Sequence, residues 1–393
     1  MTDLPLLWLY GPSGVGKTRV AWEIFERLGR TDAQVGFVDI DQLGMCYGPP
    51  TPENWVPEPA DDPGRHRLEA RALDAVVANF RSAGARGLIV PGVIDPARGV
   101  ETGLVPNAAV TTCRLRAEPD ELTRRLTARD GAAADPAREL AQAVILDRSS
   151  GPVVDTTGSP VSEVADRVLE QTRWPDLTAG NDPVGGRPAA DPGPGPIPWL
   201  CGDPVGGRPA AGPEPGPVLW LCGPKGAGKS TIGWQVYQQA RHAGHVAAFV
   251  DLDQIGFQRP SGGHRLKAAN LAAVWRAFRA AGAERLIAVG PLDDPKDLQL
   301  YDTGNMTVCV LRASPRTLAD RIELRGRGVT PARGLAGDDL IGRPPARLRE
   351  VADRAAHTMA ALDDAGDLRV VTNDRQPADI AAEILRRAGW TAA

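Results

Sequence analysis

Two copies of one Gly-rich loop constrain the fold of this 393-residue chain more than any other feature. Each copy fits the pattern G-x-x-x-x-G-K-[ST] and directly follows an apolar run, at residues 6–10 and at residues 218–222. In such a loop the glycines let backbone N–H groups turn toward phosphate oxygens, the Lys neutralises charge and the hydroxyl ligates Mg²⁺. A helix is expected to begin at each loop and to point its N-terminus at the phosphates. The predicted phosphate-binding residues are Gly11, Pro12, Ser13, Gly14, Val15, Gly16, Lys17 and Thr18, and Gly223, Pro224, Lys225, Gly226, Ala227, Gly228, Lys229 and Ser230.

Lysine usage favours nucleotide binding over a structural Gly-rich turn, which is the alternative explanation of the pattern. Only five of the 45 basic residues are lysines. Both loops nevertheless carry Lys at the position where a compact ammonium is needed. We therefore predict a nucleotide at both loops.

Composition narrows the remaining function classes. The formal net charge of −4 gives no electrostatic footprint for nucleic acid, so no nucleic-acid partner is expected. No stretch reaches the apolar length of a membrane span, and no basic segment precedes an apolar signal core at the N-terminus. We expect a cytoplasmic protein without a membrane partner. The five cysteines have no C-x-x-C spacing and are predicted to be buried free thiols, at Cys46, Cys113, Cys201, Cys222 and Cys309.

The second half of the sequence repeats the first. Lys229, Asp251 and Asp253 each lie 212 positions after Lys17, Asp39 and Asp41, and residues 264–266 repeat residues 66–68 at an offset of 198. An internal duplication explains both offsets if the second copy has lost 14 residues between these points. We predict two domains, residues 1–178 and 217–393.

A Pro/Gly-rich segment, residues 179–216, separates the two predicted domains. It contains a short repeat of its own, in which residues 182–190 recur at 203–211. Such a composition buries little surface, so we expect a semi-extended linker. A docking site for a proline-recognising partner is the alternative.

Short β-rich runs alternate with Ala/Leu/Arg-rich helical segments within each copy. This order predicts an α/β fold in which each domain is a doubly wound parallel sheet of about five strands flanked by helices. Ligands of such sheets bind at the carboxyl ends of the strands. The expected strands are residues 6–10, 35–39, 87–91, 109–115 and 152–156, and residues 218–222, 247–251, 286–289, 306–311 and 368–372.

The second expected strand of each copy ends with an acidic pair: Asp39 with Asp41, and Asp251 with Asp253. Residues two apart on a strand share a face, and this face is expected to lie beside the Gly-rich loop. The first carboxylate of each pair is predicted to hold Mg²⁺ through water. The second would accept a proton from, or orient, a substrate hydroxyl. Capping of a following helix is the alternative role for these acids.

The loops, the Asp-x-Asp pairs and a late Arg-rich segment together resemble small-molecule and nucleotide kinases of the P-loop class. Examples are shikimate, gluconate and adenylylsulfate kinases and chloramphenicol phosphotransferase. The pairing of two copies also resembles uncharacterised actinobacterial P-loop ATPases. The late segments are residues 115–129 and 311–327.

The resemblance implies a mobile lid whose arginines close over the transferring phosphate, namely Arg125 with Arg129, and Arg321 with Arg325 and Arg327. The spacing of four puts each leading pair on one helix face; a solvated helix face is the alternative. The resemblance also implies that the turn after the fifth strand, Thr156 and Thr157, touches adenine. The second copy has Asp374 where the first has Gly158.

Each copy also has a His-Arg pair, His66 with Arg67 and His264 with Arg265, at the start of a helix expected to flank the acceptor pocket. The arginines are candidates to bind an anionic acceptor and the histidines to assist proton movement, while a structural His is the alternative. Tyr47 and Trp55 lie in the longer loop of the first copy, either as lining of a pocket or as anchors of the loop.

These expectations combine into a tandem P-loop kinase that moves the γ-phosphoryl of Mg·ATP to a hydroxyl of a small-molecule acceptor. Lys17 and Lys229 would hold the phosphates, and Thr18 and Ser230 the Mg²⁺. Asp39 and Asp251 would hold the water shell of the metal, and Asp41 and Asp253 the acceptor hydroxyl. Two alternatives remain at this stage: a regulatory ATPase that acts on a protein partner, and a tandem with one non-catalytic copy.

Overall fold

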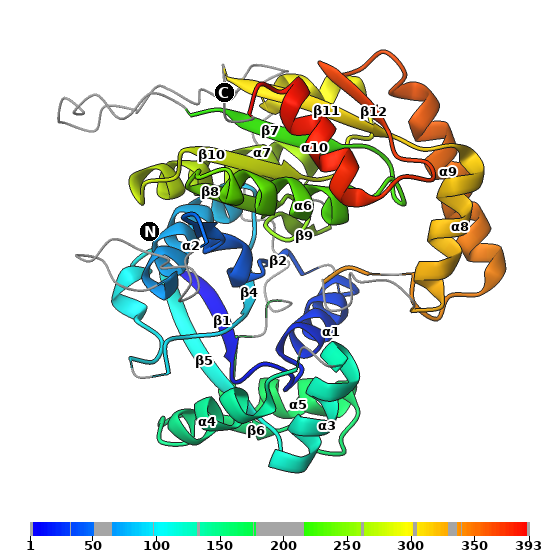
Figure 1. Ribbon diagram of the computed structural model, residues 1–393. Helices are drawn as coiled ribbons and strands as arrows, with labels where there is room; N and C mark the ends of the chain where they lie inside the picture. Colours follow the sequence, from blue (N-terminus) through cyan, green and yellow to red (C-terminus); the bar gives the residue numbers. More distant parts are fainter. Residues whose placement is uncertain are drawn as a thin grey trace.

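The computed structural model describes residues 3–31, 33–50, 65–96, 98–131, 134–175, 177, 216–260, 263–301, 305–328, 336–338 and 340–390. We call residues 3–177 the first half and residues 216–390 the second half; in Figure 1 the first half lies below the second. The linker predicted at residues 179–216 falls almost wholly outside the described residues, as do Trp55 and Cys201. The described α-helices are α1 (Lys17–Gly29), α2 (Arg65–Ser82), α3 (Pro119–Asp130), α4 (Pro136–Leu146), α5 (Val161–Thr172), α6 (Lys229–His242), α7 (Gly263–Ala280), α8 (Pro315–Gly326), α9 (Pro345–Ala361) and α10 (Pro377–Arg387).

Five strands of the first half form a parallel sheet in the order β6-β5-β1-β4-β2. The predicted runs lie where these strands do, although β2 ends two residues before Asp39. Their bounds are β1 (Leu4–Tyr10), β2 (Val35–Phe37), β4 (Gly87–Pro91), β5 (Ala108–Arg116) and β6 (Val153–Asp155).

The second half repeats this sheet with the order β12-β11-β7-β10-β8, again with all five strands parallel. The α/β prediction and its parallel strands are therefore confirmed. The bounds are β7 (Val218–Cys222), β8 (Ala247–Asp251), β10 (Arg285–Val289), β11 (Met306–Arg312) and β12 (Leu368–Val371).

Each sheet has a sixth strand that comes from the other half, so the prediction of about five parallel strands from one copy is wrong in this respect. β9 (Phe257–Arg259) of the second half pairs antiparallel with β2, and β3 (Cys46–Tyr47) of the first half pairs antiparallel with β8. The physical reason is that β2 and β8 would otherwise be open sheet edges, whose unpaired N–H and C=O groups accept a further strand. The two sheets are thus mixed, and the halves exchange edge strands.

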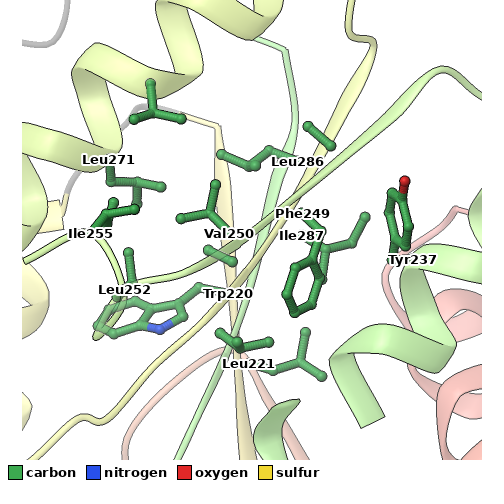
Figure 2. Packing of buried hydrophobic residues seen from close by; sticks show 14 of the residues in the cluster. Trp220, Leu221, Tyr237, Phe249, Val250, Leu252, Ile255, Leu271, Leu286 and Ile287 are labelled. Carbon is green, nitrogen blue, oxygen red and sulfur yellow. The ribbon is translucent and has the colours of Figure 1, made fainter. Parts of the chain in front are cut away.

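Alternation along β1 explains how each sheet is covered on both faces. Leu7 and Leu9 pack with residues of α1 and α5, whereas Leu6 and Trp8 belong to the cluster that includes α2. Successive side chains of a strand point to opposite faces, so a fully apolar strand needs a helix layer on each side. In the second half, Figure 2 shows Phe249 near Tyr237 of α6, while Leu252 and Ile255 lie toward Leu271 of α7.

The two halves share one apolar core. Helices α2 and α7 pack against each other, and the buried cluster that contains Leu73 of α2 also contains Leu271 of α7. Asn79 donates to Asn270 across this contact at 3.0 Å, and Asn270 is fully buried. Apolar burial of this kind contributes about 25 cal/mol per Å² of covered surface, so the α2–α7 contact stabilises the joined form of the halves.

The aromatic residue of each exchanged strand anchors it to the other half. Phe257 of β9 lies edge-on to Trp22, with ring centroids 4.8 Å apart, and 6.0 Å from Phe37. Tyr47 of β3 is buried, and the Arg241 guanidinium of α6 lies 5.5 Å from the centre of its ring. Tyr47 therefore anchors its segment to the second half, and the alternative that it is an exposed pocket residue is wrong.

Cys46, Cys113, Cys222 and Cys309 are free and buried, which confirms the prediction for four of the five cysteines. Among the described residues, no helix has both the length and the apolar character needed to cross a membrane.

Candidate functional site

Each Gly-rich loop connects the central strand of its sheet to a helix, β1 to α1 and β7 to α6. Gly16 and Gly228 precede these helices with φ values of +96° and +97°, a conformation that costs an L-residue strain. A Cβ at Gly11 would lie 2.3 Å from the carbonyl oxygen of Leu115, so β5 also closes on the loop. These local requirements place the N-terminus of a long helix at the carboxyl edge of each sheet, where an anion is favoured.

The loop lysines point back into their own loops. The Lys17 ammonium donates to the carbonyl oxygens of Gly11 at 2.9 Å and Pro12 at 3.0 Å, and Lys229 donates to Pro224 at 3.0 Å. Burial lowers the pKa of both ammonium groups, against the opposing effect of the neighbouring carboxylates. A buried ammonium is stabilised when an anion replaces the neutral carbonyl oxygens as its partner, so the position of these lysines favours anion binding.

The first carboxylate of each acidic pair is buried beside the loop. Asp39 and Asp251 are each 7% exposed, and burial together with the second carboxylate raises their pKa values above the usual range. In the second half, Ser230 Oγ donates to Asp251 Oδ2 at 3.0 Å. A buried carboxylate next to a hydroxyl is the kind of oxygen set that Mg²⁺ uses, and a cation there would relieve the unfavourable burial of negative charge.

The acidic residues of the first half do not lie two apart on a strand as predicted. Asp39 follows the end of β2 and caps the 3₁₀ turn η1 (Ile40–Leu43), where its carboxylate accepts from the N–H of Asp41 at 3.1 Å. In the second half Asp251 ends β8 and accepts in the same way from the N–H of Asp253 at 3.0 Å. The capping alternative is therefore correct for this local contact, and a turn rather than a strand face brings the two carboxylates together.

The second carboxylate of each pair is more exposed and bound to a cation from the following helix. Arg65 donates to Asp41 at 2.9 Å and also to the buried Glu69 at 2.6 Å. In the second half, Lys267 contacts Asp253 at 2.5 Å. Position 267 is the counterpart of Glu69 at the offset of 198, so the two copies supply the cation from different helix positions. Sequence reasoning missed Arg65, Glu69 and Lys267, although charged residues next to the His-Arg pair were a visible signal.

The His-Arg pairs lie on the same helix starts but make different contacts. His66 Nδ1 lies 2.9 Å from Glu69 Oε2, and Arg67 Nε lies 4.0 Å from Glu101. His264 Nδ1 lies 3.0 Å from the Tyr301 hydroxyl, and its Nε2 lies 3.5 Å from Asp297.

Arg265, the partner of His264 in the sequence pattern, is exposed. The two histidines therefore share a position and both lie near carboxylates, but Nδ1 faces Glu69 in the first half and the Tyr301 hydroxyl in the second.

The arginines of the late segments divide into two groups. Arg125 donates to the carbonyl of Val15 at 3.3 Å and to Thr156, at 2.8 Å to its carbonyl and 2.9 Å to its hydroxyl. Arg321 makes the matching contacts to Ala227 and to Thr372. This first group joins the back of each Gly-rich loop to the turn after the fifth strand.

The second group lies at or near the loop openings. Arg129 donates to the Ser13 hydroxyl at 3.1 Å and pairs with Asp130, while Arg325 pairs with Asp338 at 2.8 Å. Both arginines of the first half therefore contact its loop, Arg129 through the Ser13 hydroxyl and Arg125 through the Val15 carbonyl.

The turns after the fifth strands have the same backbone form in both halves. Thr156 and Thr372 are buried and bonded to the arginines above, and the Thr157 hydroxyl accepts from the N–H of Glu118 at 2.8 Å. Gly158 has φ +64° and its counterpart Asp374 has φ +50°. Asp374 therefore keeps the left-handed backbone conformation of Gly158. Asp can do so because it tolerates positive φ better than most other residues do.

A contact that the sequence did not predict involves Glu139 of α4. Its carboxylate accepts from the backbone N–H of Ser13 at 2.7 Å, within the first Gly-rich loop. Asp135 caps α4 by accepting from the N–H of Arg138, which fixes the start of the helix that carries Glu139. The Glu139 carboxylate thus occupies one of the loop donors that a phosphate would need.

Each acidic pair is also bonded to the other half. The N–H of Asp251 donates to the side-chain oxygen of Gln42 at 2.9 Å, and the N–H of Asp39 donates to the backbone carbonyl of Gln254 at 2.9 Å. Both glutamines follow directly after the second aspartate of their own pair. The two candidate sites are therefore linked through the exchanged segments. In the described part of the chain, no group of three or more His, Cys, Asp or Glu side chains is arranged to hold a metal by itself.

No protein-family model matches the chain, and no curated protein matches its sequence. Solved structures do match it over a little under half its length. A sugar kinase from Janibacter sp. matches at 19% identity and TM-score 0.34, covering 45% of this chain and 99% of the kinase. The tunicamycin resistance protein of Deinococcus radiodurans matches at 27% identity and TM-score 0.32, covering 43% and 95%. A gluconokinase from Sinorhizobium meliloti matches at 20% identity and TM-score 0.31, covering 44% and 94%.

Shikimate kinases and an APS kinase are also among the matches. The matched sugar, gluconate, shikimate and APS kinases are small-molecule kinases of the kind that the sequence motifs resemble. TM-scores at this level carry no conclusion about activity, for which the residues of the site are the evidence.

Proposed function

We propose that the chain is a tandem ATP-dependent phosphotransferase, with P-loop units at residues 1–178 and 217–393. It moves the γ-phosphoryl of Mg·ATP to a hydroxyl of a small-molecule acceptor. The observation that carries this proposal is the grouping seen in the second half: a loop lysine, the Ser230–Asp251 contact of 3.0 Å, and the more exposed Asp253 beside them. The first half has the same residue types in the same order.

Phosphate binding follows from the loop geometry. The ammonium groups of Lys17 and Lys229 exchange loop carbonyl oxygens for phosphate oxygens, which relieves the cost of their burial. The loop N–H groups and the N-termini of α1 and α6 supply the remaining donors. In the first half, Glu139 leaves the N–H of Ser13 when phosphate arrives.

Thr18 with Asp39 and Ser230 with Asp251 are the residues that would hold Mg²⁺. These residues suit Mg²⁺ because both carboxylates are buried and a hydroxyl lies next to one of them. When bound, Mg²⁺ neutralises charge on the phosphates and orients them for in-line displacement.

The second carboxylates supply the proton acceptor. The acceptor hydroxyl oxygen forms a bond to the γ-phosphorus while the bond from that phosphorus to the bridging β,γ-oxygen breaks. The hydroxyl proton passes to Asp41 or Asp253, and ADP leaves with the bridging oxygen. Arg65 and Lys267 form ion pairs with these carboxylates and hold them at the mouth of each site.

Arginines and the late turns complete each unit. Arg129 and Arg325 are placed to move onto the transferring phosphate. Arg125 and Arg321 fix the loops to the turns that contain Thr156 and Thr372, and Thr157 lies at the expected adenine edge.

A transfer assay tests the proposal. The chain is incubated with γ-³²P-labelled Mg·ATP and pools of sugars, polyols, hydroxy acids, nucleosides and antibiotics, and label on an organic product is measured. Label on at least one compound, lost in an Asp41→Asn, Asp253→Asn double variant that still binds nucleotide, is the expected result. Slow release of inorganic phosphate with no labelled compound would instead favour the regulatory ATPase.

A further inference from the structure

Helix α4 of the first half buries little of its surface. Only Leu146, its last residue, is buried, whereas Val144 and Ile145 are 60% and 40% exposed. Directly after the helix, Asp147 pairs with Arg114 of β5, which fixes its C-terminal end. A helix that buries so little apolar surface costs little free energy to displace, so α4 can move without opening the core.

Near the start of α4, Glu139 lies where ligand phosphate is expected. Its carboxylate accepts from the backbone N–H of Ser13 at 2.7 Å, and the Ser13 hydroxyl accepts from Arg129 at 3.1 Å. Burial lowers the pKa of the Lys17 ammonium, while the negative charges of Asp41 and Glu139 oppose this effect. The carboxylate therefore binds an N–H and acts on an ammonium that a nucleotide phosphate would both use.

The second half has no acid at the matching position. Leu146 and Leu362 are both buried, and each directly precedes an aspartate that pairs with an arginine of β5 or of β11. Seven positions before these leucines are Glu139 in the first half and Ala355 in the second. Ala355 is buried within α9. The contact between α4 and its loop is therefore a feature of the first half alone.

Helix α9 is also fixed more firmly than α4. It packs along α8 (Figure 1), and a Cβ at Gly326 of α8 would lie 2.5 Å from the side chain of Leu348. The second loop has Lys225 at the position of Ser13. It thus carries a further cation where the first loop faces a carboxylate. The buried residues of α9 are Leu348, Ala352, Ala355 and Met359.

We propose that α4 is an autoinhibitory element that makes the two nucleotide sites unequal. Glu139 takes the place of a phosphate in the first loop, and a nucleotide must displace it before that site can fill. The second site has no such competitor at the matching position, so it fills at lower nucleotide concentrations. Transfer by the first half therefore begins at concentrations that already occupy the second half. This inference rests on the nucleotide-binding part of the proposed function and adds a regulation of the first site.

Calorimetry with Mg·AMPPNP on the full chain tests the order of filling. The second site is titrated in a Lys17→Ala background and the first site in a Lys229→Ala background. The Kd of the second site is expected to be about tenfold lower, because the first site must give up one charge-assisted contact when the ligand binds. Equal Kd values, or a tighter first site, would overturn the inference.

Variants of two glutamates assign the difference to one carboxylate. Glu139→Gln keeps the size of the side chain and removes its charge. It is expected to lower the Kd of the first site about 2- to 10-fold and to leave the second site unchanged, which also shows that the chain is folded. Loss of a merely structural contact would weaken binding, so the direction of the change separates the two roles.

Glu170→Gln is the matched control, since it removes the same charge from an exposed position of α5. Both sites should keep their affinities in this variant. An unchanged or raised Kd of the first site in Glu139→Gln, or an equal fall in Glu170→Gln, would contradict the autoinhibitory role.

The proposed function can fail separately. If the wild-type chain labels no compound in the transfer assay, the phosphotransferase proposal fails, but the order of filling can still be measured because AMPPNP binding needs no transfer. If a compound is labelled, Glu139→Gln in the Lys229→Ala background is expected to lower the KM for ATP. An unchanged KM for ATP would overturn the autoinhibition and leave the proposed function standing.

Discussion

Replacement of Gln42 by Ala is expected to weaken nucleotide binding in the second half, although Gln42 itself belongs to the first. Gln42 follows the acidic pair of the first half, is 7% exposed, and accepts the N–H of Asp251 at 2.9 Å through its side-chain oxygen. The carboxylate of Asp251 in turn accepts from Ser230 at 3.0 Å. The side chain of Gln42 therefore fixes the backbone of a residue proposed to hold Mg²⁺ in the second half.

The magnitude follows from the buried donor that the change leaves behind. An unsatisfied buried N–H costs about 1–3 kcal/mol. We expect the free energy of unfolding of Gln42→Ala, measured in urea, to fall by an amount in this range. Part of the same cost should appear in binding, as a rise of about 5- to 20-fold in Kd for Mg·AMPPNP at the second site. Calorimetry in a Lys17→Ala background isolates that site.

Gln254→Ala is the matched control. Asp39 of the first half donates to the backbone carbonyl of Gln254, which Ala retains, while the side chain of Gln254 bonds the backbone of Ala336 instead. The first site, titrated in a Lys229→Ala background, should keep its affinity. An unchanged second site in Gln42→Ala, or a weakened first site in Gln254→Ala, would refute this account of the link between the halves.

Three further results are expected. Lys17→Ala and Lys229→Ala should each reduce the calorimetric stoichiometry of Mg·AMPPNP from two to one, because each removes the buried cation of its own loop; an unchanged value of two would contradict this. Asp41→Asn, measured in a Lys229→Ala background so that only the first site turns over, should lower the rate of phosphoryl transfer by about two to four orders of magnitude and leave nucleotide Kd nearly unchanged, and normal turnover would remove Asp41 as proton acceptor. Glu139→Gln should tighten nucleotide binding at the first site by about 2- to 10-fold, because a neutral amide competes less well with phosphate for the N–H of Ser13; weaker binding would mean that Glu139 assists the ligand.

Several features of the fold and the site could be predicted because they depend on local sequence. The apolar runs predicted strands that the structure confirms, since a strand buried on both faces must be apolar throughout. The Gly-rich loops require left-handed glycines followed by a helix, and Gly16 and Gly228 have that conformation. The acidic pairs lie beside the loops because only one crossover separates them in the chain.

Other features depended on contacts between distant residues, which no local pattern encodes. The pairing of β9 with β2 joins positions more than 200 residues apart, and it covers β2, which would otherwise be an open sheet edge. Glu139 reaches Ser13 only when α4 folds back on the loop, and the cation of each acidic pair comes from whichever helix position points toward it. Sequence alone therefore determined the chemistry available in each copy. The tertiary structure decided how the two copies are joined, because the exchanged edge strands and the α2–α7 contact bring together residues that lie far apart in the chain.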